Sequence, residues 1–205
     1  DVVAYTGTGS ARTQNHNLAA TPELIIVKTR SHASNWYAYV EALGNQAYLV
    51  PNKSEGAGTG MSIWNSTSPT SSVFSLAGSG WNVNESGKTY VAYLFATLDG
   101  ISKVGSYSGT GSNIDVDCGF TAGARFVLIK RTDGAAVSGN GDWYVFDSHR
   151  GIVSGNDPYL LLNDNAAEVT NTDYIDPLNS GFTVTSSAPA NLNTSGGTYI
   201  FLAIA

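Results

Sequence analysis

The sequence is poor in charge. Charged residues make up 13% of the 205-residue chain, roughly half of the usual share of about 25%. The ten Lys and Arg residues are scattered and are outnumbered by acidic residues, so that the net charge is −6. Binding to a phosphate backbone requires clustered Lys and Arg. We therefore expect no nucleic-acid partner.

Cysteine and long apolar runs are also scarce. Cys118 is the only cysteine, which excludes an internal disulfide and fits folding in a reducing cytoplasm. No stretch reaches the length of a transmembrane helix, so we expect no membrane insertion. The sequence begins at Asp1 rather than Met, and we expect the chain to be trimmed or excised from a longer polypeptide.

Glycine and aromatic residues are abundant, with 23 Gly, 11 Tyr, 7 Phe and 4 Trp. Short runs rich in Val, Ile, Tyr and Phe recur along the chain, separated by Gly, Ser, Asn and Asp. That spacing is typical of an antiparallel β-sandwich or barrel. Only Ser54 to Gly58 and Asn163 to Val169 have the composition of a short helical turn. The sequence therefore predicts an all-β fold.

One stretch occurs twice. Residues 84–96 read NESGKTYVAYLFA, and residues 193–205 read NTSGGTYIFLAIA. Each copy is a turn marked by glycine and followed by a nearly unbroken apolar run, which predicts a strand buried on both faces. We expect each to be the central strand of one half of a duplicated fold.

Other motifs recur in the same order in both halves. The pairs are AYTGTGS (residues 4–10) with SYSGTGS (106–112), PELIIVKTR (22–30) with ARFVLIKRT (124–132), and NWYAYVEAL (35–43) with DWYVFDSHR (142–150). An Asp-Gly turn at residues 99–100 joins the halves. We predict an internally duplicated antiparallel β-sandwich, jelly-roll-like, with pseudo-symmetric halves at residues 1–97 and 98–205 that are either separate or fused into one compact unit.

These motifs resemble a duplicated domain found in tail and other virion proteins of bacteriophages, especially marine ones. The elements that carry the resemblance are SYSGTGS, RFVLIKRT, GDWYVFDS and NTSGGTYIFLAIA, with VKTR, NWYAYV, IWNSTSPTSSVF and GKTYVAYLFA in the first half. The resemblance covers essentially all 205 residues. It implies a virion structural protein with a tail-fibre or receptor-binding role, and it supplies no catalytic residues.

The aromatic residues divide into paired and unpaired positions. Trp36 and Trp143 occupy equivalent places, as do Tyr90 and Tyr199, and we interpret these four as packing anchors of the repeated fold. Trp81 has no aromatic counterpart, and it precedes Asn82 in a loop. A flat aromatic face stacks on the apolar face of a sugar ring. Trp81 and Asn82 are therefore the candidate ligand-binding residues.

Candidate catalytic and metal sites are weak. Asp115 and Asp117 share one strand face, and Asp173 and Asp176 lie in a loop, but neither pair indicates the cleft that a glycosidase needs. Asp115 and Asp117 are weak calcium candidates, as are the loops at residues 156–157 and 163–165. The three histidines lack zinc-site spacing. His149 lies near Asp147 and Ser148, but no nucleophile-elbow motif surrounds it. We expect neither enzyme activity nor a cofactor.

The sequence as a whole favours a non-enzymatic virion protein that is made in the host cytoplasm. The expected role is adhesion, in a tail fibre that contacts a host surface glycan or protein. A head fibre or capsid decoration protein is the alternative, and a polysaccharide depolymerase is a third, less favoured hypothesis. The apolar C-terminal run YIFLAIA must be covered by the neighbouring half or by another subunit. We therefore expect other virion proteins as partners and a homo-oligomer, such as a trimer.

Overall fold

The computed structural model of the protein describes residues 1–78, 80, 82–133 and 141–205. Strands make up 40% of the chain and helices 4%, and the sheets are antiparallel. The all-β class predicted from the sequence is confirmed. None of the helices among the described residues is long and apolar enough to cross a membrane.

The chain forms two compact units. The first comprises Asp1–Asn52 and Ala57–Ala96, and the second comprises Lys53–Gly56 and Thr97–Ala205. The short segment Lys53–Gly56 thus belongs to the second unit although it is surrounded in sequence by the first. Elsewhere the units divide after Ala96, and the motif repeat predicted a boundary between residues 97 and 98.

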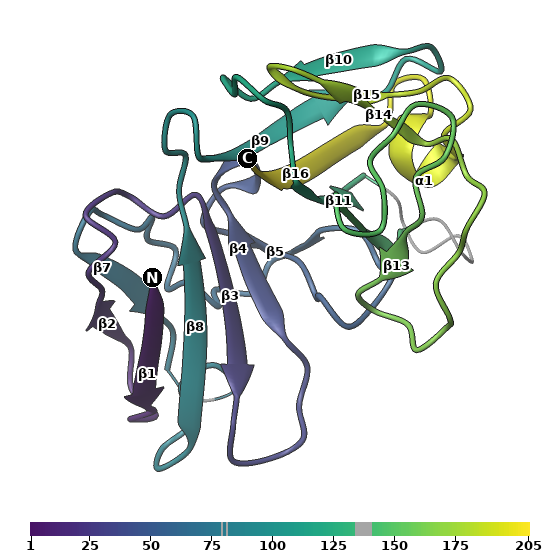
Figure 1. Ribbon diagram of the computed structural model, residues 1–205. Helices are drawn as coiled ribbons and strands as arrows, with labels where there is room; N and C mark the ends of the chain where they lie inside the picture. The colour runs from purple at the N-terminus through teal and green to yellow at the C-terminus, as the bar shows by residue number, and fades with distance from the viewer. Residues whose placement is uncertain (79, 81, 134–140) are drawn as a thin grey trace. The chain divides into compact units, whose positions relative to one another are not determined.

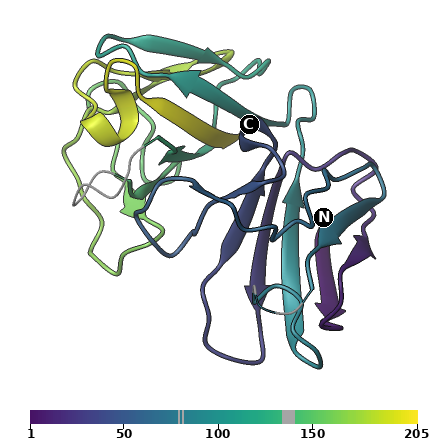
Figure 2. The same cartoon turned by 180° about the vertical axis from the view of Figure 1, so that it is seen from behind.

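The described residues of the first unit form one large sheet and two small ones. The large sheet has the order β1 (Val2–Thr6), β8 (Thr89–Phe95), β3 (Leu24–Thr29) and β4 (Tyr37–Val40), as Figures 1 and 2 show from opposite sides. The small sheets pair β2 (Arg12–Asn15) with β7 (Val73–Leu76), and β5 (Ala47–Tyr48) with β6 (Gly58–Thr59). Tyr5 and Ile25 of the large sheet share one buried core with Phe74 and Leu76 of β7.

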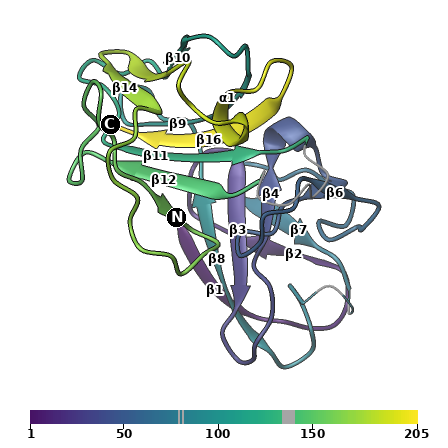
Figure 3. The same cartoon turned by 90° about the vertical axis from the view of Figure 1, so that its right-hand side faces the viewer.

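The described part of the second unit forms two sheets. The larger has the order β13 (Leu160–Leu161), β12 (Trp143–Asp147), β11 (Phe126–Arg131), β16 (Thr198–Ile204) and β9 (Ser102–Ser108). Figure 3 shows β12, β11, β16 and β9 side by side. The smaller has the order β10 (Ile114–Asp117), β15 (Gly181–Val184) and β14 (Ile175–Leu178). Val116 and Phe182 of the smaller sheet pack in one core with Tyr199 and Phe201 of the larger.

The large sheets of the two units repeat one strand order. β1-β8-β3-β4 corresponds to β9-β16-β11-β12, with every neighbouring pair antiparallel. β8 and β16 are therefore internal strands, as the repeated motif predicted. The jelly-roll description stays a prediction.

The prediction of burial on both faces is right for β16 and wrong for β8. In β16, all five residues from Tyr199 to Ala203 are buried. In β8, Tyr90, Ala92 and Leu94 are buried, but the residues between them are only partly covered. A nearly continuous apolar run therefore does not distinguish a strand covered on both faces from one that is covered fully on one face.

The two segments whose composition allowed a short helical turn do not form one. Val169 pairs with Tyr159 through hydrogen bonds in both directions, which draws the end of the Asn163–Val169 segment into an extended conformation. Gly58 lies in β6. The short helical segments are η1 (Glu41–Leu43) and α1 (Ala190–Asn193), which immediately precedes the turn into β16.

Candidate functional site

A buried asparagine organises the turn before the last strand of each unit. The Asn84 side chain accepts a hydrogen bond from Thr8 N at 3.0 Å, and it donates to Ser10 O at 2.7 Å and Ala77 O at 2.8 Å. Asn84 is 1% exposed. Because a buried amide is costly to leave unsatisfied, this residue connects the Gly-Thr-Gly loop firmly to the closing turn.

Asn193 makes the matching contacts in the second unit. It accepts from Thr110 N at 3.0 Å and Gly111 N at 3.1 Å, and it donates to Ser112 O and Thr185 O, both at 2.8 Å. The Gly-Thr-Gly loops of the sequence are thus held by these asparagines. Their side-chain amides therefore have a structural role in both units.

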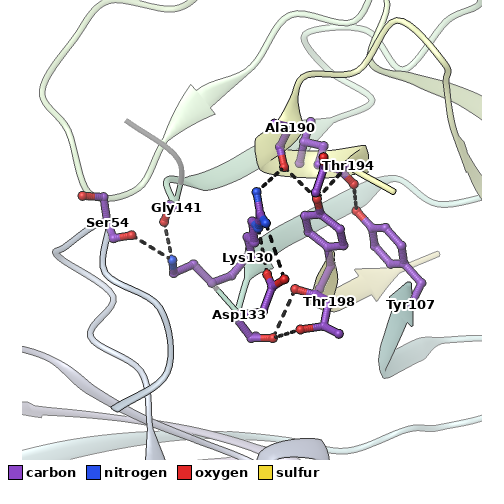
Figure 4. Close-up of polar contacts among 12 residues, drawn as sticks. Ser54, Tyr107, Lys130, Asp133, Gly141, Ala190, Thr194 and Thr198 are labelled. Carbon is purple, nitrogen blue, oxygen red and sulfur yellow. Dashed lines mark hydrogen bonds and ion pairs between the residues drawn. The ribbon is translucent and has the colours of Figure 1, made fainter. Parts of the chain in front are cut away.

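The tyrosine anchors lie in stacked pairs. Tyr90 stacks on Tyr5 with ring centres 5.1 Å apart, and Tyr199 stacks on Tyr107 at 4.9 Å. The hydroxyl of Tyr199 accepts from Thr194 N and donates to Ala190 O, beside the Tyr107 hydroxyl shown in Figure 4. Burial raises the pKa of both Tyr90 and Tyr199 above the usual value.

The tryptophan anchors differ between the units. Trp143 is fully buried, whereas Trp36 is only partly buried. A lysine ammonium lies over each ring, with Lys28 Nζ 5.8 Å from the centre of the Trp36 ring and Lys130 Nζ 5.9 Å from that of Trp143. The conserved place in the repeat therefore serves packing and a cation–π contact, at two different depths.

Lys130 is a buried cation in the second unit. Its Nζ donates to Ser54 O at 3.2 Å and to Gly141 O, and Figure 4 shows the side chain reaching toward both. Burial lowers the pKa of Lys130 from 10.5 to about 8, against the opposing influence of Asp142 and Glu55. The ammonium is satisfied by carbonyls, so this lysine fixes the segment Lys53–Gly56 within the unit.

Stability should depend on pH through Lys130. Between pH 8 and 10.5 the unfolded chain binds the proton that the folded chain has released, so the free energy of unfolding should rise with pH, by about 1 kcal/mol per pH unit. Urea unfolding at pH 8 to 9 should show this rise in a Cys118→Ala background and lose it in Lys130→Met. The Cys118 change is needed because burial raises the pKa of that thiol to about 12, which acts in the opposite direction. A rise that persists in Lys130→Met would contradict the assignment.

The other sequence candidates do not converge on one site. Trp81 lies outside the described residues, so the structure describes only Asn82 of that pair, a partly exposed residue with a φ of 50°. Asp115 Oδ1 accepts from Thr183 Oγ1 at 2.7 Å, and Asp117 Oδ1 accepts from Gly119 N at 2.8 Å. Within the described part of the chain, no three His, Cys, Asp or Glu side chains form a group suited to a metal ion.

A groove of about 390 Å³ opens in the second unit between strands β9 and β10. It is lined by residues 103–107 of β9, residues 114–117 of β10 and Phe201 of β16. β9 and β10 are the edge strands of their two sheets. This volume lies within the usual range of ligand sites, about 300–1,000 Å³. The groove is therefore the candidate functional site.

The equivalent place in the first unit is filled by an arginine. Strands β2 and β10 pair with β7 and β15 in the same register, which makes Arg12 the equivalent of Ile114. The Arg12 guanidinium carbon lies 5.4 Å from the centre of the Tyr5 ring, and its Nη2 donates to Gln14 Oε1 at 2.8 Å. Ile114 has no comparable reach, so the ring of Tyr107 contributes to an open groove instead.

A second residue difference between the units determines the floor of the groove. The cross-strand pair Val3 and Ala92 of the first unit becomes Gly105 and Phe201 in the second. A Cβ atom at position 105 would lie 2.7 Å from the Phe201 ring. Only glycine therefore allows the ring to lie against β9, where it forms the apolar floor.

A third difference between the units concerns a charged residue at the start of the edge strand. Asp1 of the first unit accepts a hydrogen bond from Asn17 N at 2.7 Å, which ties the start of β1 to the segment after β2. The residue at the equivalent place in the second unit is Lys103. Among the described residues, the Lys103 ammonium has no hydrogen-bond or ion-pair partner. The groove therefore combines an apolar floor with one available cation, which suits an elongated ligand that carries an anionic group.

Sequence reasoning missed Lys103, Gly105 and Phe201. The repeat carries a weak signal, because Lys103, Gly105 and Phe201 differ from their first-unit counterparts Asp1, Val3 and Ala92. It pointed to the second unit, whereas the unpaired Trp81 pointed to the first.

Comparison with known proteins gives one match. A family model described as "Domain of unknown function (DUF7483)" matches residues 1–205. No curated protein and no solved structure matches the chain. The match spans the repeated framework and the groove alike, and the chain therefore belongs to the DUF7483 family.

Proposed function

We propose that the chain is a non-enzymatic structural protein of a bacteriophage virion that works as an adhesion module of a tail fibre. It is made in the host cytoplasm, assembles with other virion proteins as a homo-oligomer, and contacts a glycan or protein of the host surface. The motif resemblance supports the virion part of this proposal. The observation that carries the adhesion part is the groove of the second unit, at the place where Arg12 lies over the Tyr5 ring in the first unit.

The one triad-like composition in the chain supports a role without catalysis. Asp147 Oδ1 accepts from the backbone N of His149 at 3.0 Å and of Arg150 at 2.9 Å, and Asp147 also pairs with the Arg150 guanidinium. The Asp147 carboxylate is thus engaged in closing the turn after β12. These contacts hold a turn rather than orient an imidazole toward a nucleophile.

Exposed apolar side chains support assembly into an oligomer. Leu98 and Ile101 are each more than half exposed and lie in the same short turn of the second unit. An apolar pair of this kind is suited to a subunit contact. Light scattering of the purified chain measures its oligomeric state, and a homo-oligomer that is weakened by Leu98→Ser is the expected result. A monomer at all concentrations would contradict this part of the proposal.

Adhesion is tested by binding the purified chain to host cell envelopes. Ile114→Arg should place a guanidinium over the Tyr107 ring, as Arg12 lies over the Tyr5 ring, and it should lower binding by about tenfold or more. The reciprocal change Arg12→Ile is the matched control and should leave binding unchanged. Failure of the wild-type chain to bind any envelope, or equal binding by both variants, would contradict the adhesion proposal.

The architectural alternative is separated by position in the particle. Antibody labelling of the chain in electron micrographs should place it on the tail; a location on the head would favour a capsid decoration protein. Incubation with host polysaccharide should release no sugar, and release of oligosaccharides would favour a depolymerase.

A further inference from the structure

The β9 edge of the groove carries backbone groups that are free to pair. Ala205 N donates to Ile101 O and Gly109 N donates to Gly197 O, and the register between them is continuous. In an antiparallel pair, alternate residues of a strand exchange hydrogen bonds with the neighbour. The odd-numbered residues of β9 therefore face β16, and the even-numbered residues face away from it.

Some of the outward-facing backbone N–H and C=O groups of β9 have hydrogen-bond partners, and others do not. Val104 N donates to Thr97 Oγ1 at 3.3 Å, and Val104 O accepts from the same hydroxyl. Ser106 and Ser108 follow in the same orientation, and neither backbone makes an outward hydrogen bond to any residue that the structure describes. Both residues are exposed. Unpaired donors and acceptors on an exposed edge are a template for another strand.

The charges of the groove lie on the side where such a strand would run. Lys103 projects from the same face of β9 as Gly105 and Tyr107, because side chains alternate along a strand. On β10, Val116 is buried in the core, whereas Asp115 and Asp117 are exposed on the opposite face. Asp115 and Asp117 are also among the residues that line the groove. Each carboxylate already accepts a hydrogen bond, from Thr183 Oγ1 and from Gly119 N, whereas the Lys103 ammonium has no such partner among the described residues.

We propose that the groove takes an extended polypeptide segment of a partner protein, which adds as a strand along Ser106 and Ser108 of β9 and places a carboxylate against Lys103. Main-chain hydrogen bonds to the edge supply affinity, and the Lys103 ammonium selects acidic side chains. This inference deepens the proposed adhesion function and rests on it.

The groove suits a peptide better than a saccharide. Sugar binding uses an exposed aromatic face, but Phe201 is 2% exposed and is packed edge-on against Phe182 with ring centres 5.4 Å apart. The Tyr107 ring is stacked on Tyr199, and its hydroxyl donates to Leu192 O at 2.8 Å. The aromatic rings are thus committed to the core, while backbone groups remain available.

The test uses a displayed library of random linear peptides selected on the full chain, followed by affinity measurement with the selected synthetic peptides. Ser106→Pro removes the outward N–H of β9 and leaves the hydrogen bonds to β16 in place. Proline is tolerated at such a position of an edge strand. The matched control is Ala4→Pro, the equivalent residue of β1 in the first unit. Lys103→Glu is a second variant that leaves the backbone unchanged. Thermal unfolding checks that each variant is folded.

The library should yield acidic peptides whose affinity falls by about tenfold or more in both Ser106→Pro and Lys103→Glu, and stays the same in Ala4→Pro. The inference is overturned if no acidic peptide is selected, if affinity survives both changes, or if an array of acidic glycans binds in their place. If the Ser106→Pro variant no longer binds the peptide but still binds host envelopes, then adhesion does not use the β9 edge. That result would overturn this inference and leave the adhesion proposal standing. Peptide binding that follows the expected pattern without any envelope binding would overturn the adhesion proposal alone.

Discussion

Replacing Asp157 by Asn should raise the free energy of unfolding at neutral pH by roughly 3 kcal/mol. Asp157 is fully buried, and its Oδ2 accepts from Tyr174 N at 2.7 Å and Ile175 N at 3.0 Å. Its Oδ1 is buried without a hydrogen-bond partner. Burial, with the nearby charges of Asp173 and Asp176, raises the pKa of Asp157 from 3.8 to about 6.

The sign of the pH dependence follows from that shift. The folded chain holds a proton on Asp157 that the unfolded chain releases, so this contribution is complete below pH 3.8 and is lost as the pH rises through 6. Wild-type stability should therefore fall between about pH 4 and pH 6. Asn resembles the protonated acid in shape and charge, so Asp157→Asn should be flat over this range.

Urea unfolding at a series of pH values measures the effect. Asp164→Asn is the control, because Asp164 is exposed, and it should follow the wild-type curve. A variant Asp157→Asn that is less stable than wild type at neutral pH would show that the carboxylate charge supports the fold, against the expectation.

The acidic group around Asp157 is peculiar to the second unit. Ala77 N donates to Ile63 O, as Thr185 N donates to Tyr174 O, which aligns Ile63 with Tyr174. The equivalents of Asp157, Asp173 and Asp176 in the first unit are then Gln46, Ser62 and Asn65. The first unit should accordingly show no such pH dependence.

Replacing Asn193 by Asp should destabilise the second unit by about 4 kcal/mol at neutral pH. The change keeps the shape and both acceptor contacts, but a carboxylate cannot donate to Ser112 O and Thr185 O and would face both carbonyls at 2.8 Å. The penalty should shrink at low pH, where the protonated acid regains one donor.

Asn84→Asp is the matched change in the first unit. Amide hydrogen exchange reports the two units separately: Asn193→Asp should speed exchange in β16, and Asn84→Asp should speed it in β8. Exchange that stays slow in both variants would show that neither asparagine holds its closing turn, which is contrary to the contacts described above.

The strands could be predicted from the sequence because the same strand motifs occur in both halves of the chain. The repeated NESGKTYVAYLFA and NTSGGTYIFLAIA stretches correspond to β8 and β16, which are internal in equivalent sheets. The buried roles of Tyr90 and Tyr199 followed from the same repetition, since residues kept in both copies serve the shared fold. Local pattern alone was sufficient there because side-chain alternation and turn chemistry are local properties.

The groove could not be predicted in the same way. It depends on Ile114, which replaces Arg12 at the equivalent position of the second unit, and on Gly105, which makes room for the Phe201 ring. Both effects involve contacts between strands that are distant in sequence. The depth difference between Trp36 and Trp143 has the same origin. Burial is a property of tertiary packing, and composition near a tryptophan does not determine it.

Amide hydrogen exchange of the wild-type chain, with and without an acidic peptide selected from the random library, tests most directly the claim that the second unit binds through the open edge of β9. The outward amides of Ser106 and Ser108 should exchange more slowly in the complex, while those of Ala4 and Thr6 in β1 should not change. Protection of β1 instead, or binding that leaves Ser106 and Ser108 unprotected, would contradict the account.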